Sequence, residues 1–157
     1  MKTALVTGAA GFIGTQIVKE LCSKGYTVYA LIEKNDIRGR EKLSSIFNRI
    51  EIIEELKEGN DYSPFDNIYH TATVGIRPDF DNIDLICDVN IKMSCDLVDY
   101  AKRNNSGLLV NFGSCFEYGD HGDVLLTEDM ECKPESLYAI SKVASTSLVT
   151  AYAKKKV

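Results

Sequence analysis

The sequence predicts an α/β fold in which helices cover both faces of a doubly wound parallel sheet. Short apolar, β-branched segments alternate with longer segments that carry apolar residues at helical spacing, and this order is typical of parallel β-α-β units. The 157 residues fit one domain, and 45% hydrophobic with 26% charged residues is an ordinary globular composition. We therefore expect residues 1–157 to form a single domain.

Strands and helices are expected to alternate along the whole chain. The strands are expected at residues 3–7, 26–32, 50–53, 67–71 and 108–112, and the helices at residues 12–24, 36–48, 82–104 and 136–154. The first strand is apolar and ends at a glycine, and the first helix stops at Gly25. The charged segment 36–48 is typical of a surface helix, and 57–64 is expected to be a loop.

The second half of the chain continues this alternation. The segment 82–104 carries apolar residues at helical spacing, with Asn90 as the exception. A polar loop containing Gly119, Gly122 and Pro134 then separates the fifth strand from the last helix. That helix ends in a run of lysines, which is favourable at the negative end of the helix dipole.

Composition excludes several classes of protein. A net charge of −5 argues against a nucleic-acid binder, which usually has a basic face. No apolar run approaches the ~20 residues that cross a bilayer, and the N-terminus reaches Gly8 too soon for a signal peptide. The cysteines number 5 and form no C-x-x-C pair, so we expect reduced thiols and no metal site. The prediction is a cytoplasmic protein with no membrane partner.

A glycine-rich turn joins the first strand to the first helix. Gly8, Gly11 and Gly14 are spaced as G-x-x-G-x-x-G. The first glycine permits a tight turn, the second lets the backbone approach a pyrophosphate, and the third lets the helix pack close to the strand. Free amides at the helix start favour phosphate charge. The turn predicts a Rossmann-type dinucleotide site, and the residues expected to contact the cofactor here are Gly8, Ala10, Gly11, Phe12, Ile13 and Gly14.

The end of the second strand is expected to select the cofactor. An acidic residue there binds the ribose hydroxyls of NAD, and a basic residue accommodates the phosphate of NADP. Ile32 occupies the usual position and does neither. Glu33 next to it favours NAD, whereas Lys34, Arg38 and Arg40 favour NADP. NAD and NADP both stay open, with a slight preference for NADP.

The last helix opens with a tyrosine and a lysine four residues apart, Tyr138 and Lys142, which share one helix face. A phenol is a weak acid, and a nearby ammonium favours its ionised form. Tyr138 is then suited to exchange a proton with a substrate hydroxyl. Ser114 follows the fifth strand, where parallel sheets bind ligands, and its hydroxyl suits the same reacting oxygen. Ser114, Tyr138 and Lys142 are the expected catalytic residues.

These motifs, in this order, resemble the extended short-chain dehydrogenase/reductase superfamily, which includes NAD(P)-dependent nucleotide-sugar epimerases, dehydratases and reductases. The matching segments are residues 7–14, 67–72, 88–90 and 113–119 and the Tyr138/Lys142 helix. The resemblance implies that Ser114 and Tyr138 bind the sugar 4-position and that Lys142 orients Tyr138 and the cofactor. It also implies cofactor contacts by Thr71, Ala72, Asn90, Tyr138 and Lys142, with His70 as a structural residue.

The chain departs from this family in two respects. Dehydratases of the family carry an acidic residue two places before the loop tyrosine, where Phe116 stands here with Glu117 beside it. The second departure is length, because relatives are about twice as long. We expect the chain to be the cofactor-binding N-terminal portion, without the C-terminal strands and the substrate domain.

The expected function is that of a nucleotide-sugar 4-epimerase or a 4-keto-sugar reductase, with a nucleotide sugar as the small-molecule substrate. Two alternatives stay open, namely a non-catalytic dinucleotide-binding or sensing module and a reductase of a non-sugar carbonyl. The resemblance further implies a homodimer through the helices at 82–104 and 136–154. Small residues such as Ala144 and Ala151 would permit close helix approach there.

Overall fold

The computed structural model describes residues 1–46, 50–56 and 64–155. Most of the predicted loop 57–64 and the end of the predicted helix 36–48 lie outside these residues. The chain forms two compact units. The first, which we call the sheet unit, contains Met1–Ala72 and Asp99–Phe112, and the second, the helical unit, contains Thr73–Val98 and the chain from Gly113 onward.

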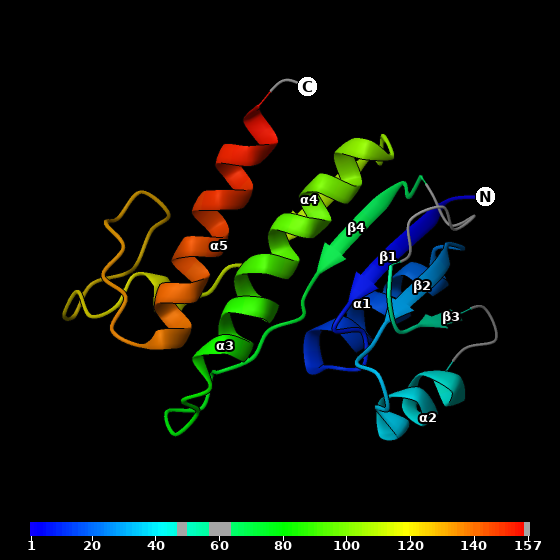
Figure 1. The fold of residues 1–157 in the computed structure, drawn as a ribbon, viewed down its shortest axis with the longest axis horizontal. Helices are drawn as coiled ribbons and strands as arrows, with labels where there is room; N and C mark the ends of the chain where they lie inside the picture. Colours follow the sequence, from blue (N-terminus) through cyan, green and yellow to red (C-terminus); the bar gives the residue numbers. More distant parts are fainter. Residues whose placement is uncertain (47–49, 57–63, 156–157) are drawn as a thin grey trace. The chain divides into compact units, whose positions relative to one another are not determined.

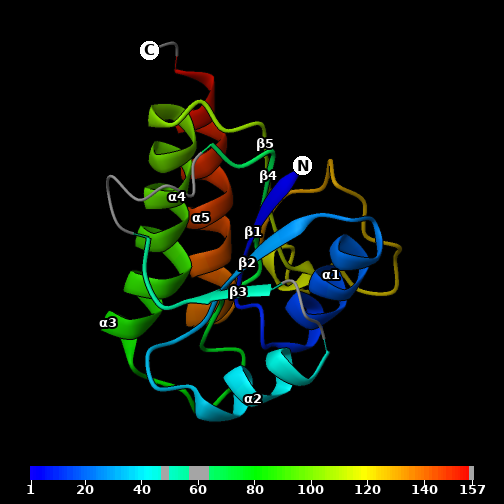
Figure 2. The same ribbon diagram turned by 90° about the vertical axis from the view of Figure 1, so that its right-hand side faces the viewer.

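The sheet unit contains a parallel sheet with the strand order β3-β2-β1-β4-β5 (Figure 2). The strands are β1 (Thr3–Thr7), β2 (Thr27–Leu31), β3 (Ile50–Ile53), β4 (Asn67–His70) and β5 (Leu108–Asn111). Thr7 is in register with Leu31 on one side and with His70 on the other, so the carboxyl ends of three strands meet at one edge. The predicted parallel α/β sheet is thereby confirmed.

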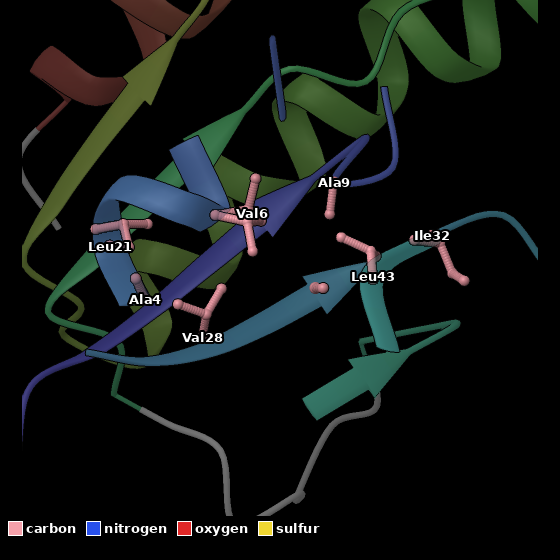
Figure 3. Close-up of a cluster of buried hydrophobic side chains, with 9 residues drawn as sticks. Ala4, Val6, Ala9, Leu21, Val28, Ile32 and Leu43 are labelled. Atoms are coloured by element: carbon pink, nitrogen blue, oxygen red, sulfur yellow. The ribbon is translucent and has the colours of Figure 1, made fainter. Parts of the chain in front are cut away.

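One face of the sheet is covered by α1 (Phe12–Ser23) and α2 (Ile37–Ile46). Alternate residues of β1 and β2, among them Ala4, Val6 and Val28, point toward Leu21 of α1 and Leu43 of α2 (Figure 3). Side chains alternate across a strand, so the residues between these serve the other face. Burial of this aliphatic cluster stabilises the attachment of both helices to the sheet.

The opposite face of the same unit carries aromatic residues. The ring of Phe65 lies 5.3 Å from that of Tyr29 in β2 and 5.9 Å from that of Tyr100. Tyr100 belongs to the last turns of α4 (Met93–Arg103), which are part of the sheet unit. Helical segments therefore pack on both faces of the sheet, as a doubly wound fold requires.

The helical unit is built on two helices that run side by side in the same direction (Figure 1). One consists of α3 (Ile83–Ile86), the π-helical segment η1 (Cys87–Lys92) and the start of α4, and the other is α5 (Leu137–Lys154). A short 3-10 turn, η2 (Cys115–Glu117), precedes α5. The sequence predicts one regular helix over 82–104, and the structure differs from this prediction by the π-helical segment Cys87–Lys92.

Candidate functional site

Gly8 directly follows β1 and has a left-handed conformation with φ +62°, which favours glycine. A Cβ at this position would lie 2.8 Å from the backbone of Ala72, just beyond β4. The glycine turn and the end of β4 thus approach too closely for any side chain between them. Gly8 and Ala72, both predicted to contact the cofactor, are neighbours in the sheet unit.

Gly11 begins α1 as its N-cap and, having no side chain, leaves the first helical turn without a side-chain cap. The backbone N–H groups of Phe12, Ile13 and Gly14 belong to this turn, where a helix has no carbonyl partners of its own. The side chains of Phe12 and Ile13 are exposed. Uncapped amides at the positive end of a helix fit a pyrophosphate, so the residues present suit a dinucleotide.

Two further contacts hold the glycine turn in shape. Thr15 donates a hydrogen bond from its hydroxyl to the carbonyl oxygen of Gly11 at 2.6 Å. A Cβ at Gly14 would collide with the carbonyl oxygen of Gly8, so this glycine allows α1 to pack directly on the turn. Thr15 was not predicted from the sequence, although threonine four residues after a glycine carbonyl is well placed to bond it.

Lys42 of α2 also contacts the turn, and the sequence interpretation missed it. Its Nζ donates a hydrogen bond of 2.8 Å to the carbonyl oxygen of Ala10. A Cβ at Gly39 would lie 2.7 Å from the side chain of Ala10, so α2 itself approaches the turn closely. The spacing of Gly39 and Lys42 on one face of α2 is the signal that could have found this contact.

The segment after β2 presents the residues expected to choose between NAD and NADP. Ile32 is buried, whereas Glu33, Lys34 and Arg38 are exposed. Arg40, also considered for a phosphate, instead forms an ion pair of 2.7 Å with Glu54.

His70 lies at the end of β4 and is 2% exposed. Its Nδ1 forms a hydrogen bond of 2.7 Å with the hydroxyl of Thr7. The same hydroxyl oxygen accepts from the backbone N–H of Ala72 at 3.3 Å, and Thr71 donates from its hydroxyl to the Thr7 carbonyl at 2.7 Å. These bonds tie His70, Thr71 and Ala72 to β1.

In the helical unit, Ser136 caps α5 by accepting a hydrogen bond from the N–H of Ala139 at 3.1 Å. This places Tyr138 in the first turn and Lys142 one turn later. Both are buried, at 7% and 4% exposure, which an ordinary surface pair would not be. Burial lowers the pKa of Lys142 below its ordinary value, and the carboxylate of Glu117 acts in the opposite direction.

Ser114 is half-buried and caps the η2 turn. Its hydroxyl oxygen accepts from the N–H of Phe116 at 3.3 Å, which leaves the hydroxyl proton to donate. The ring of Phe116 meets the ring of Tyr138 edge to face, with centroids 6.1 Å apart. The segment of Ser114 and the helix of Tyr138 and Lys142 are therefore brought together within this unit.

Asn90 is buried at 1% exposure, in the middle of η1. Its Oδ1 accepts from the N–H of Val74 and from the hydroxyl of Thr73, and its Nδ2 donates to the carbonyl of Val74 and the hydroxyl of Ser141. The apolar periodicity of 82–104 breaks here because this inward position carries a fully bonded amide. Asn90 thus fastens the segment after Ala72 to α5.

Among the residues that the structure describes, no group of three or more histidine, cysteine, aspartate or glutamate side chains is arranged to hold a metal ion. Within the same residues, no helix is both long and apolar enough to span a membrane.

Comparisons with known proteins show the family and the fold of the chain. The model of the "NAD dependent epimerase/dehydratase family" matches residues 4–157. UDP-glucuronate 4-epimerase 2 of Arabidopsis thaliana is 31% identical over 165 residues, which cover 96% of this chain and 38% of the relative. A putative anthocyanidin reductase of Ginkgo biloba is 27% identical, over 98% of this chain and 52% of the relative.

Among solved structures, UDP-glucuronic acid 4-epimerase from Bacillus cereus, in complex with NAD, superposes with a TM-score of 0.80 at 23% identity. The match covers 97% of this chain and 52% of that one, and at this identity it shows the fold. The chain spans between about two fifths and one half of the length of these relatives.

Proposed function

Because the chain belongs to the NAD dependent epimerase/dehydratase family, we propose that residues 1–157 form the cofactor-binding domain of an enzyme acting on a nucleotide sugar. The Arabidopsis relative, a UDP-glucuronate 4-epimerase, supports a sugar nucleotide as the substrate class. The observation that carries the proposal is the burial of Tyr138 and Lys142 together on α5, with the Ser114 segment packed on Tyr138 through Phe116.

The cofactor we propose is a nicotinamide dinucleotide whose pyrophosphate binds the start of α1. The left-handed Gly8 and the uncapped first turn after Gly11 support this position. Exposed Lys34 and Arg38 after β2 suit the additional phosphate of NADP, and Glu33 suits the ribose hydroxyls of NAD. The family is named for NAD, and the two basic side chains are the reason to test NADP beside it.

The proposed chemistry is oxidation or reduction at a sugar carbon. When bound, the nicotinamide would accept a hydride from that carbon or return one to it. The phenol oxygen of Tyr138 exchanges a proton with the sugar hydroxyl, and the hydroxyl of Ser114 donates a hydrogen bond to the same oxygen. The ammonium of Lys142 favours the ionised phenol and binds the cofactor ribose. Asn90 acts indirectly, because its hydrogen bonds hold the segment of Val74 against α5.

Within this family we favour a 4-epimerase or a 4-keto-sugar reductase over a 4,6-dehydratase. The resemblance implies that dehydratases carry an acidic residue at the place of Phe116, and phenylalanine has no proton to transfer in an elimination of water. The neighbouring Glu117 is buried, and its Oε1 accepts from the N–H of Ser114 at 2.7 Å. Its engagement with the backbone supports the view that it does not replace the missing acid.

A second candidate is a reductase of a non-sugar carbonyl, which the resemblance to the Ginkgo putative anthocyanidin reductase favours. The same residues would serve, because Ser114 and Tyr138 act on the oxygen of the reacting carbon in either case. Turnover assays with UDP-sugars and with small non-sugar carbonyl compounds, run side by side, distinguish the two candidates.

The proposal is tested by calorimetric titration of NAD and NADP into the chain, followed by turnover assays on the full-length gene product. We expect at least one dinucleotide to bind, and we expect Tyr138→Phe to abolish turnover with nearly unchanged cofactor affinity. Failure of both dinucleotides to bind rejects the glycine-turn site. Unaltered turnover by Tyr138→Phe rejects the assigned acid/base, and binding without any turnover favours a sensing module.

We also propose that the chain forms a homodimer through α5 and the neighbouring helix made of α3, η1 and α4. Ile140 and Leu148 of α5 are 51% and 47% exposed in the single chain, which supports burial of this surface against a second copy. Light scattering should give twice the chain mass for the unaltered protein and the chain mass for Ile140→Glu. A monomer at high concentration argues against the dimer.

A further inference from the structure

Glu117 has a buried carboxylate that the chemistry above does not use. The residue is 6% exposed and stands in η2, three positions after Ser114. Burying a carboxylate is costly unless hydrogen bonds or an opposite charge compensate it. The contacts of Glu117 must therefore compensate the cost of burying its carboxylate.

The first compensation comes from the Ser114 segment. Oε1 of Glu117 accepts a hydrogen bond of 2.7 Å from the backbone N–H of Ser114. The hydroxyl of Thr146, on α5, donates to the same oxygen at 3.4 Å. A Cβ at Gly113 would lie 2.8 Å from this oxygen, so the absence of a side chain at Gly113 makes room for the carboxylate. The carboxylate thus connects the backbone of Ser114 to α5.

The second compensation is the charge of Lys142. Burial lowers the pKa of this lysine, and the negative charge of Glu117 raises it. Glu117 and Lys142 belong to the same compact unit, and Thr146, which bonds Glu117, stands one helical turn after Lys142 on α5. The carboxylate is therefore placed to stabilise the ammonium form of the lysine.

We propose that Glu117 is a positioning residue whose one carboxylate joins the backbone of Ser114 to the turn of α5 that follows Lys142. The catalytic meaning rests on the proposed function, in which Ser114 binds the reacting oxygen and Lys142 acts as an ammonium. Glu117 links these two residues of different elements, η2 and α5, through a single side chain. Its contacts are with the protein itself, so it is not a catalytic residue.

A simpler role would be that of a helix cap alone. In a capping box, glutamate and glutamine serve equally well, because only an acceptor for the backbone N–H is required. Coupling to Lys142 additionally requires the negative charge. Glu117→Gln therefore separates the two roles, since it keeps the shape and the acceptor and removes the charge.

The decisive experiment is an NMR titration of the chain labelled with ¹³C and ¹⁵N at lysine, with the Lys142 signal assigned from Lys142→Arg. We expect Glu117→Gln to lower the pKa of Lys142, because an attractive charge is lost. Glu131→Gln, which removes an exposed carboxylate from the same unit, should leave it unchanged. An unchanged pKa in Glu117→Gln overturns the coupling.

Amide hydrogen exchange at Ser114 tests the other half of the proposal. Its N–H should be protected in the unaltered chain and in Glu117→Gln, and should exchange at least about tenfold faster in Glu117→Ala. Equal exchange in all three overturns the hold on Ser114. If Glu117→Ala does not fold, Glu117→Asp, whose shorter side chain withdraws the acceptor, takes its place. Neither readout needs cofactor or sugar, so a failure here is distinguishable from a failure of the proposed function.

Discussion

The side-chain amide of Asn90 donates a hydrogen bond of 2.9 Å to the hydroxyl of Ser141, which joins η1 to α5 within the helical unit. Ser141 in turn donates to the carbonyl oxygen of Tyr138 at 2.7 Å. One turn further along, Ser145 donates to Ser94 at 2.9 Å. The first turn of α5, which carries Tyr138, is thus fastened by buried polar contacts to the π-helical segment.

Replacing Asn90 by alanine should destabilise the protein strongly. The change leaves part-buried backbone groups of Val74 and the buried hydroxyl of Ser141 without their bonds, which costs about 2–4 kcal/mol in the free energy of unfolding. Asn82→Ala is the control, because it removes only an exposed helix cap and should cost about 1 kcal/mol. Urea denaturation measures both, and equal losses would contradict the role assigned to Asn90.

Gly8→Ala should cost more than Gly25→Ala although both glycines have positive φ. A Cβ at Gly25 meets nothing within 4 Å, so only the backbone strain of about 1 kcal/mol is expected there. At Gly8 the same strain is joined by a collision with Ala72. We expect a loss of at least about 2–3 kcal/mol and at least about tenfold weaker dinucleotide binding. Denaturation and calorimetry check the two effects, and equal losses at both positions would remove the steric argument.

The buried Lys142 should make stability rise with pH. At low pH the lysine is charged in the folded and the unfolded chain, and burial penalises the folded one. As the pH rises, Lys142 loses its proton first in the folded chain, because burial lowers its pKa there. The unfolded chain then binds more protons than the folded one, so the free energy of unfolding increases with pH. The gain is complete above the ordinary lysine value of about 10.4.

Denaturation between about pH 7 and about pH 10 measures this gain, as the difference between the unaltered chain and Lys142→Met. The exposed Lys19, replaced in the same way, is measured beside it as the reference for a lysine at the surface. A difference for Lys142→Met that stays flat with pH would show that burial does not shift this lysine.

Joint replacement of Lys34 and Arg38 by alanine should weaken NADP binding by about tenfold and leave NAD binding nearly unchanged, if these side chains meet the additional phosphate. Arg40→Ala serves as the control, because Arg40 is paired with Glu54. Calorimetric titration of both dinucleotides provides the comparison. An equal loss for NAD and NADP would assign the two basic residues to the shared part of the cofactor.

Local pattern was sufficient for most elements of the fold. The strands at 3–7 and 50–53 are found at the predicted residues, and the other strands and the ends of α1 and α5 differ by a residue or two. These segments are predictable because apolar period and turn residues act over neighbouring positions. The π-helical turn at Cys87–Lys92 was not predictable in this way. It depends on hydrogen bonds of Asn90 with Val74 and Ser141, which are distant in sequence.

The sequence by itself was enough to indicate a parallel α/β sheet, a glycine turn suited to pyrophosphate and the Ser114, Tyr138 and Lys142 set. Each follows from local pattern, namely the alternation of elements, a glycine spacing, a place just after a strand or a shared helix face. Only the tertiary structure decided that Tyr138 and Lys142 are buried and that Arg40 is paired. It also decided that Lys42 contacts the glycine turn at Ala10 and that Glu117 contacts the backbone of Ser114. Such contacts depend on which helix faces which turn, and that follows from packing of the whole unit.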